Sequence, residues 1–501
     1  MRASRGVRSR TLLLKVRWLF LTVCVFLVAV GLVLLAAVIP PAKAKPVFGK
    51  PVAVPAGQVS LACPQVPPTV NPDAVDTNNR PLAAPQIAGS TSAAVLARTG
   101  KIPQHAMFQP VAVTDEKQPE TGVKGDVLRL MPRSGALFGK YPEPVSGFLT
   151  ADPWEGKVVL AAAHTEQSVS SGDYRGLVTA TCQAPAIENW LVGGSTAPGS
   201  SAVLQLMNPS ENRVKVRVEV WADTEKVKFP RGEEIMVAPR SAQKLPLESQ
   251  VSGYERLVIR VTAGGGGVAA YLMTHDMLGL NPGGVSLVTP AQPPAQTQVI
   301  PGVIMDKARG AVRLMNPENK MAHVNIEVVN ENGRFALPGG KNIEVDPDSV
   351  LDVGVGALQE GSYAVVVRAD SPVVAGAVMY RQVDAADSEK KPGARDLAWV
   401  PSRPTGGGVI MGAEAIDRQL LVTNLTTRPK QFSIDGAKHP VAAGRSTVLT
   451  LKNNVPQLVV APDLYVTQVM SANLGDGAGI DVLEPAADLG EVRRIYVHFA
   501  G

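Results

Sequence analysis

Apolar and polar residues alternate along Leu204–Trp221, LQLMNPSENRVKVRVEVW, and the pattern predicts two strands joined by a turn. Every second residue from Val214 to Val220 is valine, and the residues between them are charged. A period of two is typical of a strand with one buried and one solvent-facing side. Asn208-Pro209 interrupts the pattern and is expected to form the turn, because asparagine bonds its own backbone and proline fixes φ.

The pattern recurs at Val312–Asn330 (VRLMNPENKMAHVNIEVVN) and, less closely, at Leu420–Ile434 (LLVTNLTTRPKQFSI). The turn asparagines are Asn208, Asn316 and Asn424, which are 108 residues apart both times. We therefore predict three tandem β repeats and assign these asparagines to their turns. The predicted repeats comprise residues 188–296, 297–396 and 397–501.

Each repeat also has a recognisable beginning and end. Trp190 opens the lead-in to the first repeat (WLVGG) and Trp399 the lead-in to the third (WVP), while Val299–Gly302 takes this place in the second. Near the end of the first repeat, Leu257–Val261 and Val268–Met273 are two apolar runs separated by glycines, and they predict a closing hairpin.

About six strands in a unit of this length are typical of an immunoglobulin-like sandwich. A strand with one apolar face needs a second sheet to cover it. The 47 glycines, 41 prolines and only 5% aromatic residues fit an all-β protein with many turns. We expect tandem sandwiches; the alternative is a closed, propeller-like array, whose blades of about 40–50 residues would fit two to a repeat.

Residues 59–187 are expected to form a divergent first β domain. Its second half contains strand-like runs at Val127–Met131, Lys157–Ala163 and Gly176–Thr181. Cys63 and Cys182 bracket the domain. They are the only cysteines besides Cys24, which lies in an apolar run, so we predict a disulfide between them if the chain is exported.

The N-terminus predicts export. Residues 1–17 carry six cations and no acid, and residues 18–40 form an uncharged apolar run long enough to span a bilayer. The cations predict that the N-terminus stays in the cytoplasm. The length favours a single-pass anchor, but Ala42-Lys43-Ala44 has the form of a signal-peptidase site, so secretion after cleavage behind Ala44 stays open. Residues 41–58 are rich in proline and predict a stalk.

Charge and motifs exclude several classes of function. The net charge of +5 falls to about −1 without the N-terminal cations, so we expect no nucleic-acid partner. The sequence contains no GxSxG, HExxH or CxxC motif and no histidine pair at ligand spacing. We therefore predict no catalytic residue, no metal and no cofactor. A grouping of His164, His275 and acidic residues in one pocket would argue for an enzyme instead.

The apolar N-terminal run, the cysteine pair, the tryptophan lead-ins and the LxLxNP repeats together resemble a family of uncharacterised actinobacterial envelope proteins, either membrane-anchored or secreted. The resemblance implies no functional residues.

The function most consistent with these features is a non-enzymatic scaffold or binding module of the cell envelope. Its partners would be the membrane, wall polysaccharide or other envelope proteins. Two alternatives are an accessory subunit of an envelope glycosyltransferase or polymer exporter, and a glycan or ester hydrolase with a site between domains.

Overall fold

The computed structural model describes most of the chain after residue 51. The described residues are 52–54, 56–67, 86–97, 101–115, 126–133, 135–229, 232–305, 309–382, 395–412, 416–452, 454–474, 478–488, 493–495 and the separate positions 18, 23, 26, 27 and 30. Apart from those five positions, the predicted cytoplasmic tail (1–17) and apolar segment (18–40) lie outside the described residues. In the described part of the chain, no helix has both the length and the apolar character needed to cross a membrane.

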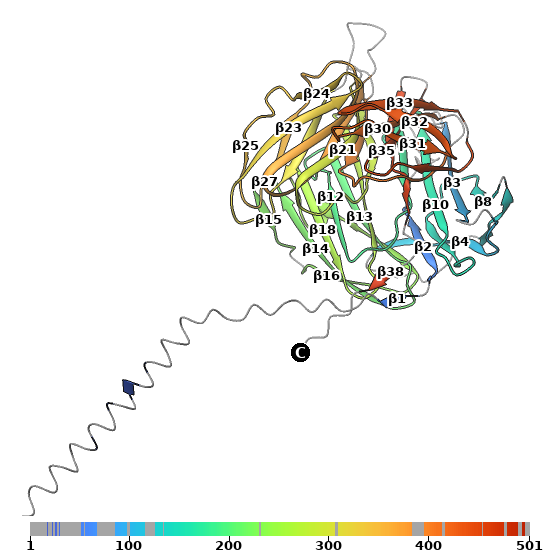
Figure 1. The fold of residues 1–501 in the computed structure, drawn as a ribbon, viewed down its shortest axis with the longest axis horizontal. Coiled ribbons are helices and arrows are strands. Elements are labelled where there is room, and N and C mark those ends of the chain that lie inside the picture. The colour runs from blue at the N-terminus through green and yellow to red at the C-terminus, as the bar shows by residue number, and fades with distance from the viewer. Residues whose placement is uncertain are drawn as a thin grey trace, which may run out of the picture. The chain divides into compact units, whose positions relative to one another are not determined.

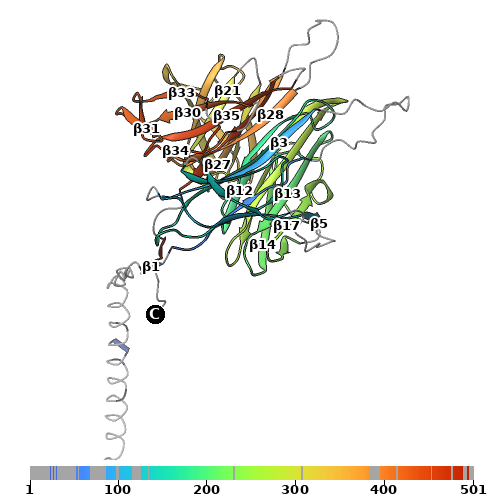
Figure 2. The same cartoon turned by 90° about the vertical axis from the view of Figure 1, so that its right-hand side faces the viewer.

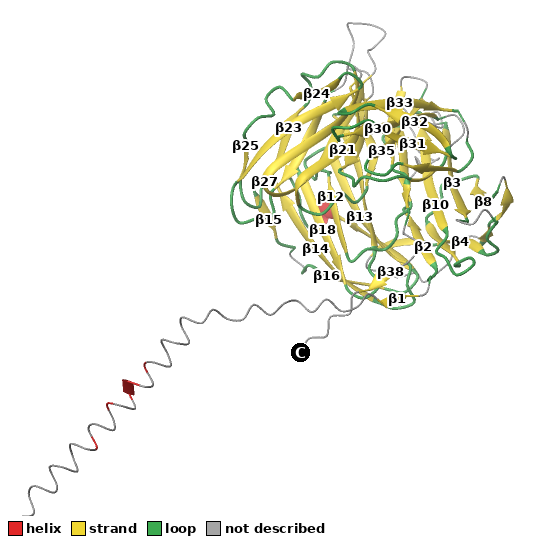
Figure 3. Cartoon of the chain, in the orientation of Figure 1, coloured by secondary structure: helices red, strands yellow, loops and turns green. Residues whose placement is uncertain are grey.

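The chain divides into two compact units, Met1–Val54 with Arg494–Gly501, and Pro55–Arg493. Strand β1 (Val52–Val54) falls in the predicted stalk and pairs with β38 (Arg493–Ile495), near the end of the segment 397–501, where the sequence predicts a third repeat with a C-terminal strand. The larger unit is built of sheets whose strands are antiparallel except for one parallel pair, so the all-β prediction is confirmed (Figure 3).

Two sheets form the first sandwich, which we define as residues 56–187 without β5. One sheet contains, in spatial order, β2 (Val59–Cys63), β9 (Gly147–Ala151), β4 (Ala106–Pro110) and β6 (Leu128–Arg129). The other contains β11 (Gly176–Thr181), β10 (Leu160–Val169), β3 (Ile87–Leu96), β8 (Ala136–Tyr141) and β7 (Met131–Arg133). Apolar side chains from both sheets share one core, including Leu61, Phe108 and Val95.

The second sandwich, residues 188–288, has the same two-layered construction. One sheet contains β12 (Glu188–Val192), β18 (Leu257–Ala263), β14 (Val214–Ala222), β15 (Glu225–Val227) and, also paired with β14, β16 (Glu234–Val237). The other contains β20 (Asn281–Val288), β19 (Ala269–Leu278), β13 (Ser200–Asn208), β17 (Ser241–Pro246) and β5 (Val113–Asp115). A 3-10 turn, η1 (Leu247–Ser249), follows β17. Strand β5 pairs parallel with β17, so the segment before residue 187 lends a strand to the second sandwich.

The third and fourth sandwiches, residues 295–401 and 408–487, repeat this pairing scheme with small changes. The third contains β21 (Ala295–Met305), β22 (Gly310–Met315), β23 (Ala322–Asn330), β24 (Gly333–Ala336), β25 (Ile343–Val345), β26 (Val350–Gly354), β27 (Gly361–Gln382) and β28 (Arg395–Pro401). The fourth contains β29 (Gly408–Ile410), β30 (Asp417–Asn424), β31 (Lys430–Ile434), β32 (Ala437–Val441), β33 (Arg445–Leu451), β34 (Gln457–Val460), β35 (Tyr465–Asn473), β36 (Ala478–Leu483) and β37 (Ala486–Ala487).

The closing hairpin predicted in the first repeat is wrong. Strand β18 pairs with β12 and β14, whereas β19 pairs with β13 and β20 in the other sheet. In the third sandwich one strand, β27, runs through both sheets: its first half pairs with β21 and β23, and its second half with β22 and β28. The two apolar runs therefore cover the core from opposite sides instead of pairing with each other.

The four sandwiches contact one another in a cycle, first with second, second with third, third with fourth, and fourth with first (Figure 1, Figure 2). One hydrogen bond from each contact illustrates the cycle: Tyr271 Oη to the Ala62 carbonyl (2.7 Å), Arg313 Nη1 to the Gly194 carbonyl (2.6 Å), Ser446 Oγ to the Val329 carbonyl (3.4 Å) and Thr181 Oγ1 to the Glu484 carbonyl (2.6 Å). Within the described residues this arrangement is a closed array rather than a string.

One strand from each sandwich lies at the centre of this cycle. β11, β20, β28 and β36 each end a sheet, and they lie against one another. Gly284 on β20 permits a close approach, because a Cβ atom there would come within 2.5 Å of the Leu397 nitrogen on β28. The edges that sheets usually leave exposed are thereby covered by neighbouring sandwiches.

Candidate functional site

The three turn asparagines make matching hydrogen bonds. Asn208 Nδ2 donates to the carbonyls of Asn212 (2.7 Å) and Val237 (3.3 Å), and its Oδ1 accepts from the Ser210 amide (3.0 Å). The corresponding bonds of Asn316 join Nδ2 to the carbonyls of Lys320 (2.7 Å) and Val345 (2.9 Å), and Oδ1 to the Glu318 amide (3.0 Å). Asn424 Nδ2 donates to the carbonyls of Arg428 (2.8 Å) and Val441 (3.2 Å), and its Oδ1 accepts from the Thr426 amide (2.9 Å).

Each of these amides ties together two points where the chain passes between sheets. Asn208 ends β13 and reaches both the start of β14 and the end of β16. All three asparagines are fully buried. Their amide groups are used within the fold, and none presents a surface to a ligand.

The two lead-in tryptophans take different positions in their sheets. Trp190 lies on β12, which pairs with β18, and its ring stacks on Trp221 at 5.4 Å between centroids. Trp399 lies on β28, which pairs with the second half of β27, and it is covered by the Arg313 guanidinium at 4.8 Å. The strand of the fourth sandwich that corresponds to β12 is β29, which follows Trp399 in the chain. It pairs with β34, as β12 pairs with β18.

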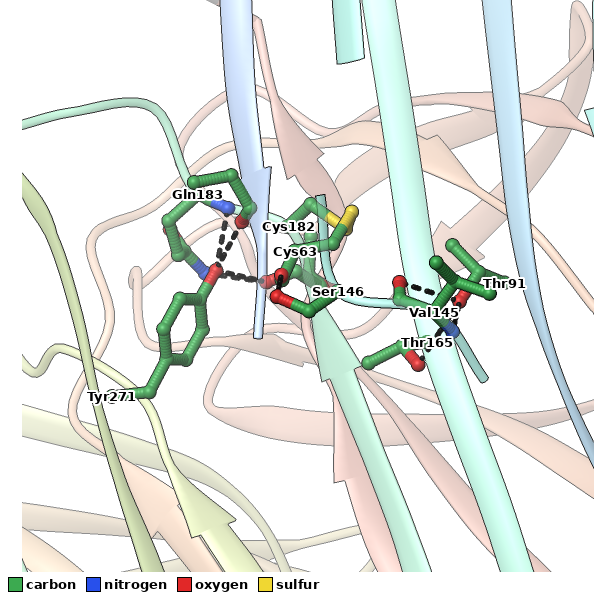
Figure 4. The surroundings of a disulfide bond; sticks show 10 residues. Cys63, Thr91, Val145, Ser146, Thr165, Cys182, Gln183 and Tyr271 are labelled. Atoms are coloured by element: carbon green, nitrogen blue, oxygen red, sulfur yellow. Dashed lines mark hydrogen bonds between the residues drawn. A yellow bond between two sulfur atoms is a disulfide. The ribbon is translucent and has the colours of Figure 1, made fainter. Parts of the chain in front are cut away.

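The predicted disulfide is present and joins the two sheets of the first sandwich. Cys63 ends β2, and Cys182 directly follows β11 (Figure 4). Tyr271, from the second sandwich, donates from its buried hydroxyl to the Ala62 carbonyl at 2.7 Å and accepts from the Gln183 amide at 2.7 Å. Burial raises the pKa of Tyr271 well above its usual value, so the hydroxyl stays a donor. The covalent link and the first contact between sandwiches therefore lie side by side.

Buried carboxylates connect the central strands. Asp396 Oδ2 on β28 accepts from the amides of Leu177 on β11 (2.9 Å) and Ile480 on β36 (3.0 Å). Asp481 Oδ2 on β36 accepts from the Thr179 amide on β11 (2.5 Å). These side chains bind amides on strand edges where another strand would normally supply carbonyls.

Both carboxyl groups titrate abnormally. Burial raises the pKa of Asp396 to about 7, although three backbone amides and Arg175 oppose the shift. Burial also raises the pKa of Asp481 well above its usual value, and the nearby Asp396 and Glu484 add to the increase. Desolvation exceeds the stabilisation that the amides give to the charged form.

A second polar group lies where the first sandwich meets the fourth. Glu166 on β10 accepts a hydrogen bond from the Ser90 hydroxyl on β3 (2.6 Å), and its other oxygen lies 3.1 Å from His164 Nε2. All three side chains are at least 95% buried. They lie beside a pocket of about 440 Å³ that Ser90 and Glu166 line from the first sandwich and Ile416 lines from the fourth.

Glu166 beside this seam pocket is held in its charged form by its neighbours. Burial raises the pKa of Glu166, but the hydrogen bonds from His164 and Ser90 and the charge of Lys140 outweigh it and hold the pKa below its usual value. Ser90 donates to the carboxylate and not to the histidine. The three side chains therefore do not follow the serine–histidine–acid order of a hydrolase triad.

His164 and His275 have different surroundings. His275 Nε2 lies 2.8 Å from the Asp173 carbonyl, and its ring packs on Tyr174 at 4.5 Å. His275 is not among the residues that line the seam pocket. Within the described part of the chain, no group of three or more histidine, cysteine, aspartate or glutamate side chains could hold a metal ion.

Residues 141–462 match the model of a family of unknown function, DUF5719. The chain belongs to this family. No curated protein and no solved structure matches the chain. The DUF5719 match includes β10 with Glu166 and β28 with Asp396, but it excludes β3 with Ser90 and β36 with Asp481. Both polar groups thus combine residues from inside and outside the family's matched range.

The sequence predictions missed Ser90, Glu166, Asp396 and Asp481. A signal for three of them exists, because each is the single acidic residue in a strand that is mostly apolar or neutral: LAAAHTEQSV, RDLAWVP and AGIDVL. An isolated acid in such a run is expensive to bury and needs a specific partner. The sequence does not say which distant strand supplies that partner.

Proposed function

We propose that this member of DUF5719 is a non-catalytic binding or scaffold protein of the cell envelope, with its β sandwiches outside the cytoplasmic membrane. The cationic N-terminus followed by an uncharged apolar run supports this placement. The disulfide supports it too, because such bonds persist in oxidising compartments. We further propose that the second, third and fourth sandwiches are copies of one immunoglobulin-like unit, which the matching asparagine bonds support.

The closed cycle of sandwiches is the observation that carries the proposal. At each contact, polar side chains hold one sandwich to the next, and none of those described is arranged as an activated nucleophile. Such an array offers a rigid platform with several outward-facing sheets, which suits binding rather than chemistry.

The test uses the full chain purified from membranes. Incubation with insoluble wall polymer should sediment the protein, and ester and glycoside substrates should stay intact. Turnover of either substrate would contradict the proposal. Stoichiometric co-purification with one membrane glycosyltransferase, without binding to wall polymer, would favour the accessory-subunit alternative.

A further inference from the structure

We propose that the seam pocket between the first and fourth sandwiches binds a neutral, hydroxyl-rich ligand of the saccharide class. This inference rests on the proposed binding role and names the site and the ligand chemistry. The pocket volume of about 440 Å³ lies in the range of roughly 300–1,000 Å³ that small-molecule sites occupy.

The charges around the pocket exclude a strongly ionic ligand. Glu166 keeps its negative charge at neutral pH, since its pKa is held below the usual value. Lys140 lines the same pocket, and the buried Arg418 interacts electrostatically with Glu166. In the pocket, an anion would meet the Glu166 carboxylate and a cation would meet the Lys140 ammonium group. A neutral molecule with both donors and acceptors avoids both conflicts.

The other pocket walls match the two surfaces of a sugar. Glu166, Lys140 and Ser168 offer an acceptor, a donor and a hydroxyl that can do either, as ring hydroxyls require. Ile87, Pro142 and Ile416 give an apolar wall for the C–H face of the ring. Amphipathic pockets with a few placed polar groups are typical of small-molecule sites.

Glu166 is held in one orientation before any ligand arrives. Ser90 fixes one carboxylate oxygen and His164 the other. Burying a charge is unfavourable unless it is paired and hydrogen-bonded, so a fixed carboxylate beside an open pocket indicates use. A pre-oriented acceptor also lowers the entropic cost of binding.

The first sandwich supplies most of the pocket lining, and the fourth sandwich adds one residue. Ser90, Lys140 and Glu166 come from the first sandwich, and Ile416 comes from the fourth. A ligand that contacts both sandwiches should therefore stabilise the packing of the fourth on the first.

The experiment screens the full chain on a printed array of glycans and then measures the strongest binder by calorimetry. Ala88 lines the pocket and is exposed, so Ala88→Trp fills the pocket without disturbing the core. We expect at least a tenfold loss of affinity with an unchanged melting temperature. The matched control is Ala437→Trp, at an exposed alanine on β32, which should bind as the wild type does.

Absence of binding to every glycan on the array, or equal affinity in Ala88→Trp, would overturn the assignment. Sedimentation with wall polymer separates this result from failure of the proposed function. If the wild type and Ala88→Trp sediment equally, the pocket assignment falls and the binding role stands. If neither sediments, both fall.

Discussion

At the scale of single residues, a buried asparagine side chain makes the same hydrogen bonds to backbone groups in three places. Asn208, Asn316 and Asn424 each satisfy carbonyls on two chain crossings that have left one sheet and not yet joined the next. Carbonyls at such crossings have no ladder partner, and leaving them buried and unbonded is unfavourable. Asparagine fits because it carries two donors and an acceptor on a short stem.

Replacing Asn316 with alanine should lower the free energy of unfolding by on the order of 3 kcal/mol. The change leaves the carbonyls of Lys320 and Val345 and the Glu318 amide without their bonds. Each buried group left unpaired costs about 1–3 kcal/mol. Urea unfolding followed by tryptophan fluorescence measures the loss.

Asn454→Ala is the matched control, because Asn454 is exposed in a loop of the fourth sandwich. It should change stability by less than about 0.5 kcal/mol. Equal losses in the two variants would show that the buried amide has no special role.

At the scale of elements, strand positions could be predicted but strand partners could not. The alternation in Val214–Val220 predicts β14, and Lys157–Ala163 and Gly176–Thr181 coincide in whole or in part with β10 and β11. The prediction of a closing hairpin was wrong because two neighbouring apolar runs look the same in the sequence in both cases. The chain can turn back to pair them in one sheet or cross to the opposite sheet. Residues 264–268 make the crossing between β18 and β19, and β27 makes it without a turn.

The strands that end at Asn208 and Asn316 do not alternate between apolar and polar residues, because both of their faces are buried. On β13, Leu204 and Leu206 face the sandwich's own core, while Gln205 and Met207 contact the first sandwich. On β22, Leu314 faces the core, while Arg313 and Met315 contact the second sandwich. Because both sides are buried, these runs lack the polar face that period two would require.

Loss of the disulfide should cost about 4–5 kcal/mol of unfolding free energy in the chain-entropy model. Cys63 and Cys182 are 119 residues apart, and a link across a long loop removes much entropy from the unfolded chain. The measurement compares the urea midpoint of the wild type with that of the Cys63→Ser/Cys182→Ser double variant.

Reductant supplies the control for this comparison. It should bring the wild type down to the midpoint of the double variant and leave the variant unchanged. A wild type insensitive to reductant, with a variant of equal stability, would refute the stabilising role.

At the scale of the larger unit, the sequence does not predict which sandwiches contact one another. The period of 108 residues predicts copies, but it fits a string and a closed array equally well. The choice depends on hydrogen bonds between residues hundreds of positions apart, such as the bond that the Thr179 backbone amide donates to the Asp481 carboxylate. For the same reason the seam pocket could not be predicted, since Glu166 and Ile416 become neighbours only when the fourth sandwich packs on the first.

The centre of the cycle makes the stability of the larger unit depend on pH in an unusual direction. Asp396 has its pKa raised from 3.8 to about 7 in the folded chain, so between these values the folded state binds more protons than the unfolded state. The contribution of Asp396 to stability is therefore fully present below its unfolded pKa and is lost as pH rises through the folded pKa of about 7. About three pKa units correspond to roughly 4 kcal/mol for this one buried group.

Asp396→Asn should flatten this dependence because the amide cannot ionise. The variant loses an acceptor for the Leu397 amide, which lowers its stability by about 1–3 kcal/mol at every pH, but its melting temperature should change less between pH 5 and pH 8. Differential scanning calorimetry at several pH values measures both effects on the same samples. The carboxylate touches the first, third and fourth sandwiches, so the main transition as a whole should shift, rather than one sandwich unfolding separately. An unchanged pH slope in the variant would mean that the proton taken up on folding resides on another group, such as Asp481.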